Sequence, residues 1–181
     1  MTYYGPKELA ASHRQVRGNT IQIAEEIPEH KYDLRAAPDS RTVAQTLVHI
    51  AVAPALQLHL HRNRVTDLQT VYFLELFQPI AAEEAKPRTK AEIITLLRAK
   101  GDELASYLEG VTDAFLAELV KMPAGSQPAT KSRFEMLLSP KEHEMHHRAQ
   151  LMVLQRMIGL TPHLTRQMQE RMAQRAAAAG R

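Results

Sequence analysis

Hydrophobic residues recur every three or four positions in four long segments of the chain, which is the spacing of an amphipathic helix. The segments span residues 6–27, 41–62, 89–111 and 133–159. No segment shows the sustained alternation of apolar and polar residues that is typical of a strand. The pattern therefore predicts an all-α protein, and four long helices favour an antiparallel four-helix bundle.

Proline, glycine and short polar residues mark the ends of these segments. Pro28 ends the first segment, and Asp39 or Ser40 can cap the second. Gly159 is a natural C-terminal cap for the last segment. Pro54 lies inside the second segment, where it has no N–H to donate and clashes with the preceding turn. We therefore expect a kink in that helix at Pro54.

Between the long segments the pattern is less regular. Residues 65–88 include an apolar patch at 71–77, and we expect a short helix or an ordered loop that packs on the bundle. Residues 114–120 are predicted to form a short helix. Residues 122–132 contain Pro, Gly and Ser, and we expect a loop.

The composition fits one globular domain with a short basic extension. The chain has 181 residues, of which 44% are hydrophobic and 24% charged. We expect a helical bundle over residues 1–165 and a tail over residues 166–181 that is rich in Arg, Gln and Ala. The net charge of +3 is small, and no aromatic residues lie among the arginines of the tail. This favours a solvated helix end and predicts no nucleic-acid partner.

Nothing in the sequence indicates export or a membrane. The N-terminal residues lack a basic stretch followed by an apolar one. The most apolar stretch, residues 47–60, is short and contains His49 and Pro54. We therefore predict a cytoplasmic protein with no membrane partner. The chain has no cysteine, so a transition-metal site would use histidines and carboxylates, which suit Zn²⁺, Ni²⁺ or Fe²⁺.

Three histidines have the spacing of a metal site. His143 and His147 are four residues apart on a predicted helix, so both rings project from one face, one turn apart. They share the apolar stripe of Leu151, which points into the bundle. A buried imidazole needs a partner, and a metal ion supplies one. His49 lies in another amphipathic segment and could reach the same point, which would give a three-histidine site with an open position.

The pair at 143 and 147 is by itself more typical of hydrogen-bonded or solvent-facing histidines than of ligands. His146 competes with His147, but its face of the helix carries Gln150 and Val153, so we favour His147. His13 lies on an apolar stripe and is more typical of a satisfied core histidine. The others are not expected to be ligands: His59 and His61, which lie on different sides of a helix, and His30 and His163, which are expected in loops.

Two segments resemble a known family. Residues 23–51, with His49 directly after Leu47 and Val48, and residues 143–162 resemble the N-terminal and closing patterns of the DinB/YfiT-type family. The resemblance implies a four-helix bundle in which His49, His143 and His147 bind a divalent metal ion. The sequence departs from the family pattern at Ala149, where glycine is usual, and this small change should not disturb the ligands.

The resemblance also implies what the metal could do. Some relatives transfer or isomerise small molecules with a low-molecular-weight thiol, which a metal ion would activate as thiolate. We therefore expect either a metal-dependent thiol transferase or isomerase, or a metal-binding or structural bundle without catalysis. Relatives often pair through bundle helices, and the apolar patch at 71–77 predicts a homodimer.

A zinc-protease motif gives a further alternative. Residues 143–147 read H-E-x-x-H, in which Glu144 would be the general base. The longer form of the motif needs glycine at 150 and histidine at 153, and the sequence has Gln150 and Val153. The sequence also predicts no strand on which a peptide could align. A metallopeptidase is therefore the weakest reading. A solvated surface carboxylate is the favoured role of Glu144, and a base or supporting role stays open.

Overall fold

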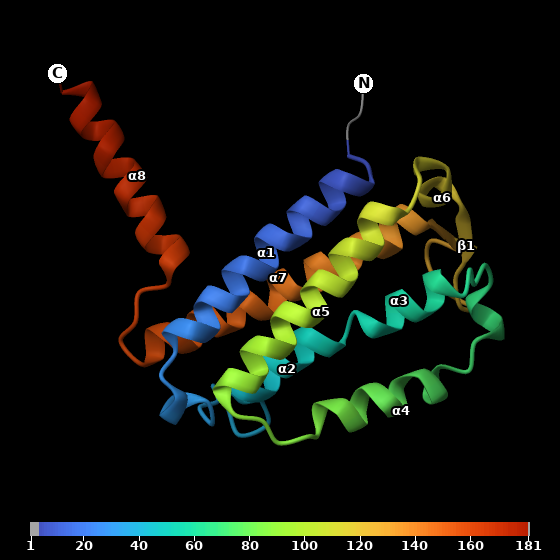
Figure 1. The fold of residues 1–181 in the computed structure, drawn as a ribbon, viewed down its shortest axis with the longest axis horizontal. Helices are drawn as coiled ribbons and strands as arrows, with labels where there is room; N and C mark the ends of the chain where they lie inside the picture. Colours follow the sequence, from blue (N-terminus) through green and yellow to red (C-terminus); the bar gives the residue numbers. More distant parts are fainter. Residues whose placement is uncertain (1–3, 181) are drawn as a thin grey trace.

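The computed structural model describes residues 4–180. Five helices build the bundle: α1 (Pro6–Glu26), α2 (Val43–Val52), α3 (Ala55–Arg62), α5 (Lys90–Gly110) and α7 (Arg133–Met157). Helices α1 and α7 run in one direction, and α2–α3 and α5 run in the other (Figure 1). Helix α1 packs on α5 and α7, and α2 packs on the same two helices. The predicted helical bundle is confirmed.

The predicted kink in the second helix is a complete break. Helix α2 ends at Val52, and Pro54 occupies the N-cap position of α3. At the other end the cap is Thr42 rather than the expected Asp39 or Ser40. The backbone N–H of Gln45 donates to the Thr42 hydroxyl at 3.1 Å, and the backbone N–H of Thr42 donates to the Gln45 side chain at 2.9 Å. This capping box fixes the start of the helix that carries His49.

The region between α3 and α5 is helical. Helix α4 (Phe73–Glu84) returns the chain along the bundle after a 3₁₀ turn, η2 (Leu68–Thr70) (Figure 1). Another 3₁₀ turn, η1 (Glu29–Lys31), follows α1. Helix α4 contacts both α2 and α3. Helix α4 therefore packs on the outside of the bundle, beside the helix that carries His49.

A small hairpin departs from the all-helical expectation. The short helix α6 (Asp113–Ala117) precedes two antiparallel strands, β1 (Leu119–Lys121) and β2 (Thr130–Ser132). The predicted helix over 114–120 is therefore too long, and the predicted loop over 122–132 ends in a strand. Strands of three residues are too short to show an alternating pattern, which is why the sequence did not reveal them.

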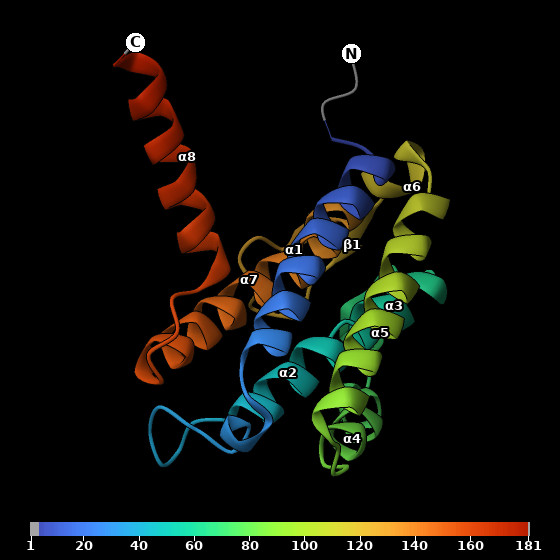
Figure 2. The ribbon, with the colours of Figure 1, turned by 60° about the vertical axis from the view of Figure 1, so that its left-hand side comes forward.

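The C-terminal helix leaves the bundle. Helix α8 (His163–Ala179) projects away from α1 and α7 (Figure 2). Residues 166–180 are all exposed, as expected for a solvated tail, but the helix begins three residues before the predicted tail. His163 is its first residue and is buried, so the prediction of a loop histidine there is wrong.

One stretch of the described chain, Val43–Arg62, is long and apolar enough by length and composition to cross a membrane. The share of that window buried inside the structure is 56%, which is also what a core helix of a bundle shows. The break at Pro54 lies in the middle of this stretch.

Candidate metal centre

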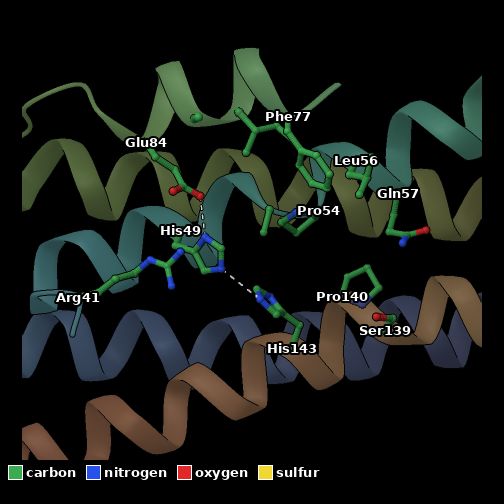
Figure 3. A pocket seen from close by; sticks show the side chains of 13 residues that line it. Arg41, His49, Pro54, Leu56, Gln57, Phe77, Glu84, Ser139, Pro140 and His143 are labelled. Atoms are coloured by element: carbon green, nitrogen blue, oxygen red, sulfur yellow. Dashed lines mark hydrogen bonds and ion pairs between the residues drawn. The ribbon is translucent and has the colours of Figure 1, made fainter. Parts of the chain in front are cut away.

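The three predicted histidines converge on one point between α2 and α7. The Nε2 atom of His143 lies 3.1 Å from the Nε2 atoms of both His49 and His147. Their candidate ligand atoms all lie within 4.8 Å of one another. Figure 3 shows the rings of His49 and His143 directed toward each other across the gap between the two helices.

The spacing of these nitrogens fits a tetrahedral metal ion. Zinc–nitrogen bonds of about 2.0–2.1 Å at tetrahedral angles put two ligand nitrogens about 3.3 Å apart. The 3.1 Å separations at His143 are close to that value. Three histidine nitrogens occupy three corners of such a site and leave the fourth for water or substrate. The donor set therefore fits a divalent ion of the zinc, nickel or iron type.

Two of the rings, those of His49 and His147, have a hydrogen-bond partner at the outer nitrogen, Nδ1, which leaves the lone pair on the inner nitrogen, Nε2. His49 Nδ1 lies 2.6 Å from Glu84 Oε1 on α4, and His147 Nδ1 lies 2.8 Å from Gln150 Oε1. In the neutral ring Nδ1–H donates a hydrogen bond to this oxygen, so Nε2 keeps a free lone pair. Lone pairs directed at the same point repel one another, and a bound cation removes that repulsion.

The imidazoles of His143 and His147 are held in the neutral form that binds metal. Burial, together with the smaller effects of the neighbouring His147 and His49, lowers the pKa of His143 to about 4. Burial also lowers the pKa of His147, although the Gln150 contact acts in the opposite direction. The charge of Arg41 contributes a smaller decrease in the pKa of both rings. Protons therefore compete weakly for these two rings near neutral pH.

Glu144, the residue after His143, faces the opposite way. Its side chain is 1% exposed and forms an ion pair with Arg17 of α1, with Nη2 of Arg17 2.9 Å from Oε2. The Nε of Arg17 donates to Oε1 of the same carboxylate at 3.0 Å. The favoured interpretation of Glu144 as a solvated surface carboxylate is therefore wrong. Both of its oxygens are occupied by Arg17, which gives Glu144 a supporting role.

Arg17 forms hydrogen bonds to both helices that carry the histidines, α2 and α7, and also to α5. Its Nη1 donates to the carbonyl of Leu97 on α5 at 2.7 Å, and its Nη2 donates to the carbonyl of Ile50 on α2 at 3.2 Å. Ile50 follows His49 in the chain, and Glu144 follows His143. One guanidinium on α1 therefore fixes the positions of α2 and α7 relative to each other, directly behind the metal centre.

Gly101 on α5 makes room for this guanidinium. A Cβ atom at this position would lie 2.7 Å from the Cγ of Arg17, which is closer than van der Waals contact allows. Sequence reasoning missed both residues. The available signal was a positive charge next to the apolar stripe of the first helix, where Val16 and Thr20 are also buried.

The structure separates the remaining histidines from the cluster. His146 is exposed and lies outside the cluster, although its ring centroid is 5.0 Å from that of His147 and its Nε2 is 3.3 Å from the Gln150 amide nitrogen. His13 is buried as predicted, but within residues 4–180 neither ring nitrogen has a hydrogen-bond partner, so it is not a satisfied core histidine. The remaining three do not pair with one another: His30 and His59 are exposed, and His61 is buried with Nδ1 3.1 Å from Arg133 Nη1.

A cavity of about 400 Å³ opens beside the cluster, between α2–α3, α4 and α7. Its walls combine His49 and His143 with apolar side chains such as Pro54, Phe77 and Pro140 (Figure 3). The volume suits a small molecule rather than a folded partner. The histidine nitrogens therefore lie at the edge of a pocket that a small substrate could enter.

The helical bundle, its three inward-facing histidines and the adjoining pocket have the arrangement that bundle proteins use to hold a metal ion between facing helices. The model of the DinB family matches residues 1–177, so the chain belongs to that family. The resemblance suggested by residues 23–51 and 143–162 is thus confirmed over nearly the whole chain.

Solved structures share the fold at low sequence identity. One of them is YfiT from Bacillus subtilis, which is described as a probable metal-dependent hydrolase with an unusual four-helix bundle topology. It aligns with a TM-score of 0.65 and 16% sequence identity, and the alignment covers 86% of this chain and 89% of YfiT. A DinB-like protein from Bacillus cereus aligns with a TM-score of 0.66 and 18% identity, over 89% of this chain and 97% of its own. No curated protein matches the sequence.

Proposed function

We propose that this protein is a metal-dependent enzyme that brings a small nucleophile to a small-molecule substrate. The observation that carries the proposal is the convergence of the three Nε2 atoms of His49, His143 and His147, two of which, His49 and His143, line the cavity. When bound there, a divalent ion supplies Lewis acidity that makes water or a thiol a better nucleophile near neutral pH. The description of YfiT as a probable metal-dependent hydrolase supports water as the nucleophile.

The chain's own residues have defined tasks in this proposal. Glu84 and Gln150 hold the outer nitrogens of His49 and His147 and so keep the inner nitrogens free for the ion. Arg17 and Glu144 hold the two helices at a fixed separation. The apolar wall around Phe77 offers a contact surface for the apolar part of a substrate.

A two-arm assay tests the proposal. Protein loaded separately with zinc, nickel or iron(II) is incubated with a panel of activated esters, amides and epoxides. One arm contains water alone and the other contains a low-molecular-weight thiol. We expect turnover that requires the metal in at least one arm, and the arm distinguishes a hydrolase from a thiol transferase. Metal uptake without turnover in either arm would favour the alternative of a non-catalytic metal-binding bundle.

The structure does not support a peptidase role for the H-E-x-x-H motif. A peptidase base must reach the nucleophile at the open position of the metal. Glu144 instead projects toward α1 and both of its carboxylate oxygens bind Arg17. We therefore propose that small molecules rather than peptides are the substrates.

The homodimer and the cytoplasmic location stay predictions. Three side chains of the predicted apolar patch are exposed: Tyr72 by 64%, Leu74 by 53% and Phe77 by 49%. An exposed apolar patch on one helix is typical of a surface that pairs with another chain. Light scattering at micromolar concentration tests the dimer, and a monomer mass counts against it.

A further inference from the structure

A positive charge lies beside the histidine cluster without an anionic partner. Arg41 lines the same cavity as His49 and His143 (Figure 3). Within residues 4–180, no carboxylate oxygen lies within 4.0 Å of this guanidinium. The side chain is exposed and is therefore free to meet a ligand.

Helix stability does not explain a cation at this position. Arg41 directly precedes Thr42, the N-cap of α2. The N-terminal end of a helix carries a partial positive charge, so an anionic residue there stabilises the helix and a cationic one destabilises it. Removing the charge of Arg41 should therefore leave the fold as stable as before or slightly more stable. A residue that is unfavourable for folding and lines a pocket is a candidate for function.

Among the described residues that line the cavity, Arg41 is the charged side chain without an ion-pair partner. The carboxylate that lines the cavity, Glu84, is 2.6 Å from the Nδ1 of His49 and is occupied there. The far end is mostly apolar, with Pro54, Phe77 and Pro140, although the polar side chains of Gln57 and Ser139 also line it (Figure 3). The cavity therefore has a cationic end, next to the metal position, and an apolar end.

We infer that Arg41 binds the carboxylate of a small substrate whose apolar body lies against Phe77 and whose reacting atom lies at the metal position. The guanidinium can donate two parallel hydrogen bonds to a carboxylate, which fixes both the position and the orientation of that group. This inference rests on the proposed function, because it assigns a substrate class to the same site.

Two matched probes test the inference. The first is 2-mercapto-3-phenylpropanoate, which has a thiol for the metal, a carboxylate for Arg41 and a phenyl ring for the apolar end. The second is its primary amide, which has the same shape without the charge. Both are titrated into the cobalt(II)-loaded protein, and binding is followed by the visible absorption of the cobalt. The titrations are repeated with Arg41→Gln, Arg41→Lys and, as control, Arg35→Gln, an exposed arginine that does not line the cavity.

We expect Arg41→Gln to weaken binding of the carboxylate probe about tenfold, since a hydrogen-bonded charge is lost, and to leave the amide probe unchanged. Comparison of the two probes across the variants cancels the difference in acidity between their thiols. Arg41→Lys should recover part of the affinity, Arg35→Gln should have no effect, and the melting temperature of Arg41→Gln should not fall.

Two results would overturn the inference. If both probes change the cobalt spectrum and Arg41→Gln affects them equally, the carboxylate subsite is absent while the proposed function stands. If the protein binds cobalt but neither probe changes the spectrum, the metal has no open position, and the proposed function and the subsite fail together.

Discussion

His143 and Glu144 are neighbours in the chain, yet they belong to two different environments. His143 is half-buried at the edge of a cavity and faces two other imidazoles. Glu144 is fully buried and faces Arg17 in the interior of the bundle. Adjacent positions on a helix are about 100° apart, so one short motif serves a surface site and an internal ion pair.

The difference shows how the two regions depend on each other. The internal pair satisfies its own charges and stabilises the arrangement of helices. The histidine cluster brings three ring nitrogens together, and a bound cation would give all three a common partner. We therefore expect changes in the internal pair to lower folding stability, and changes in the cluster to lower metal affinity with little effect on the metal-free fold.

The largest effect should come from breaking the internal pair. Arg17→Met leaves the buried Glu144 carboxylate without a cation, and we expect a loss of about 3–5 kcal/mol in the free energy of unfolding. The double variant Arg17→Met/Glu144→Leu should recover most of this loss, because it contains no unpaired charge. Urea denaturation of the metal-free protein measures both. Arg14→Met breaks an exposed pair with Glu109 and serves as the control, with an expected loss below about 1 kcal/mol.

The second effect is the dependence of folding stability on pH, which arises from the buried His13 in the internal region. The pKa of His13 is lowered to about 4, mainly by burial and secondly by the charge of Arg17. Glu144 acts in the opposite direction, and Arg14 contributes a small further decrease. An unfolded histidine has a pKa near about 6.5, so below that pH the unfolded chain binds a proton that the folded chain does not. Stability should therefore fall as the pH decreases from about 6.5 to about 4.

His13→Leu tests this pH dependence in the metal-free protein. Between pH 7 and pH 4, His13 should account for a loss on the order of 3 kcal/mol in the free energy of unfolding. The variant should not show this loss. The exposed His59 provides the control, since His59→Gln should keep the dependence of the wild type. Equal slopes of unfolding free energy against pH in the wild type and His13→Leu would contradict the expected role of His13.

The third effect separates two adjacent histidines. His147→Ala removes a predicted ligand, and we expect the affinity for zinc to fall by more than about 100-fold, which exceeds the effect of losing a supporting contact. His146→Ala removes an exposed ring and should change the affinity little. Competition with a chromophoric chelator measures both. Equal losses in the two variants would show that the wrong face of α7 had been chosen.

The smallest effect should come from a contact behind the cluster. Glu84→Gln weakens the acceptor that orients His49, and we expect zinc affinity to fall by about 10- to 100-fold. Its neighbour Glu83 binds Lys86 and Arg88 instead, so Glu83→Gln is a matched control from the same helix. If both variants bind zinc as the wild type does, Glu84 does not position the ligand.

Much of the fold and the histidine cluster could be predicted because both follow helical spacing. His143 and His147 lie four positions apart on a stripe shared with Leu151, and that spacing alone directs both rings toward one face. His49 required the additional knowledge of which helix packs opposite, and this came from the resemblance to the DinB family. The cluster is present, and its role in binding metal stays a proposal.

The internal pair could not be predicted because it depends on contacts between distant segments. Arg17 and Glu144 are 127 residues apart in the chain, and the position of Arg17 next to the apolar stripe of the first helix does not identify its partner. Charged residues are rarely fully buried, so exposure was the reasonable expectation for Glu144. The space for Arg17 is provided by Gly101 on a third helix, which only the packed structure reveals.

Metal stoichiometry tests the central claim most directly. Protein purified without affinity tags that bind metal, treated with chelator and then dialysed, is titrated with zinc in a calorimeter at pH 7.5. We predict one ion per chain, with a melting temperature that rises as the ion binds, because the ion stabilises only the folded state. The variant His49→Ala/His143→Ala should bind no zinc at this site and should melt at the same temperature with and without zinc. No uptake by the wild type, or equal uptake by the double variant, would contradict the three-histidine metal centre.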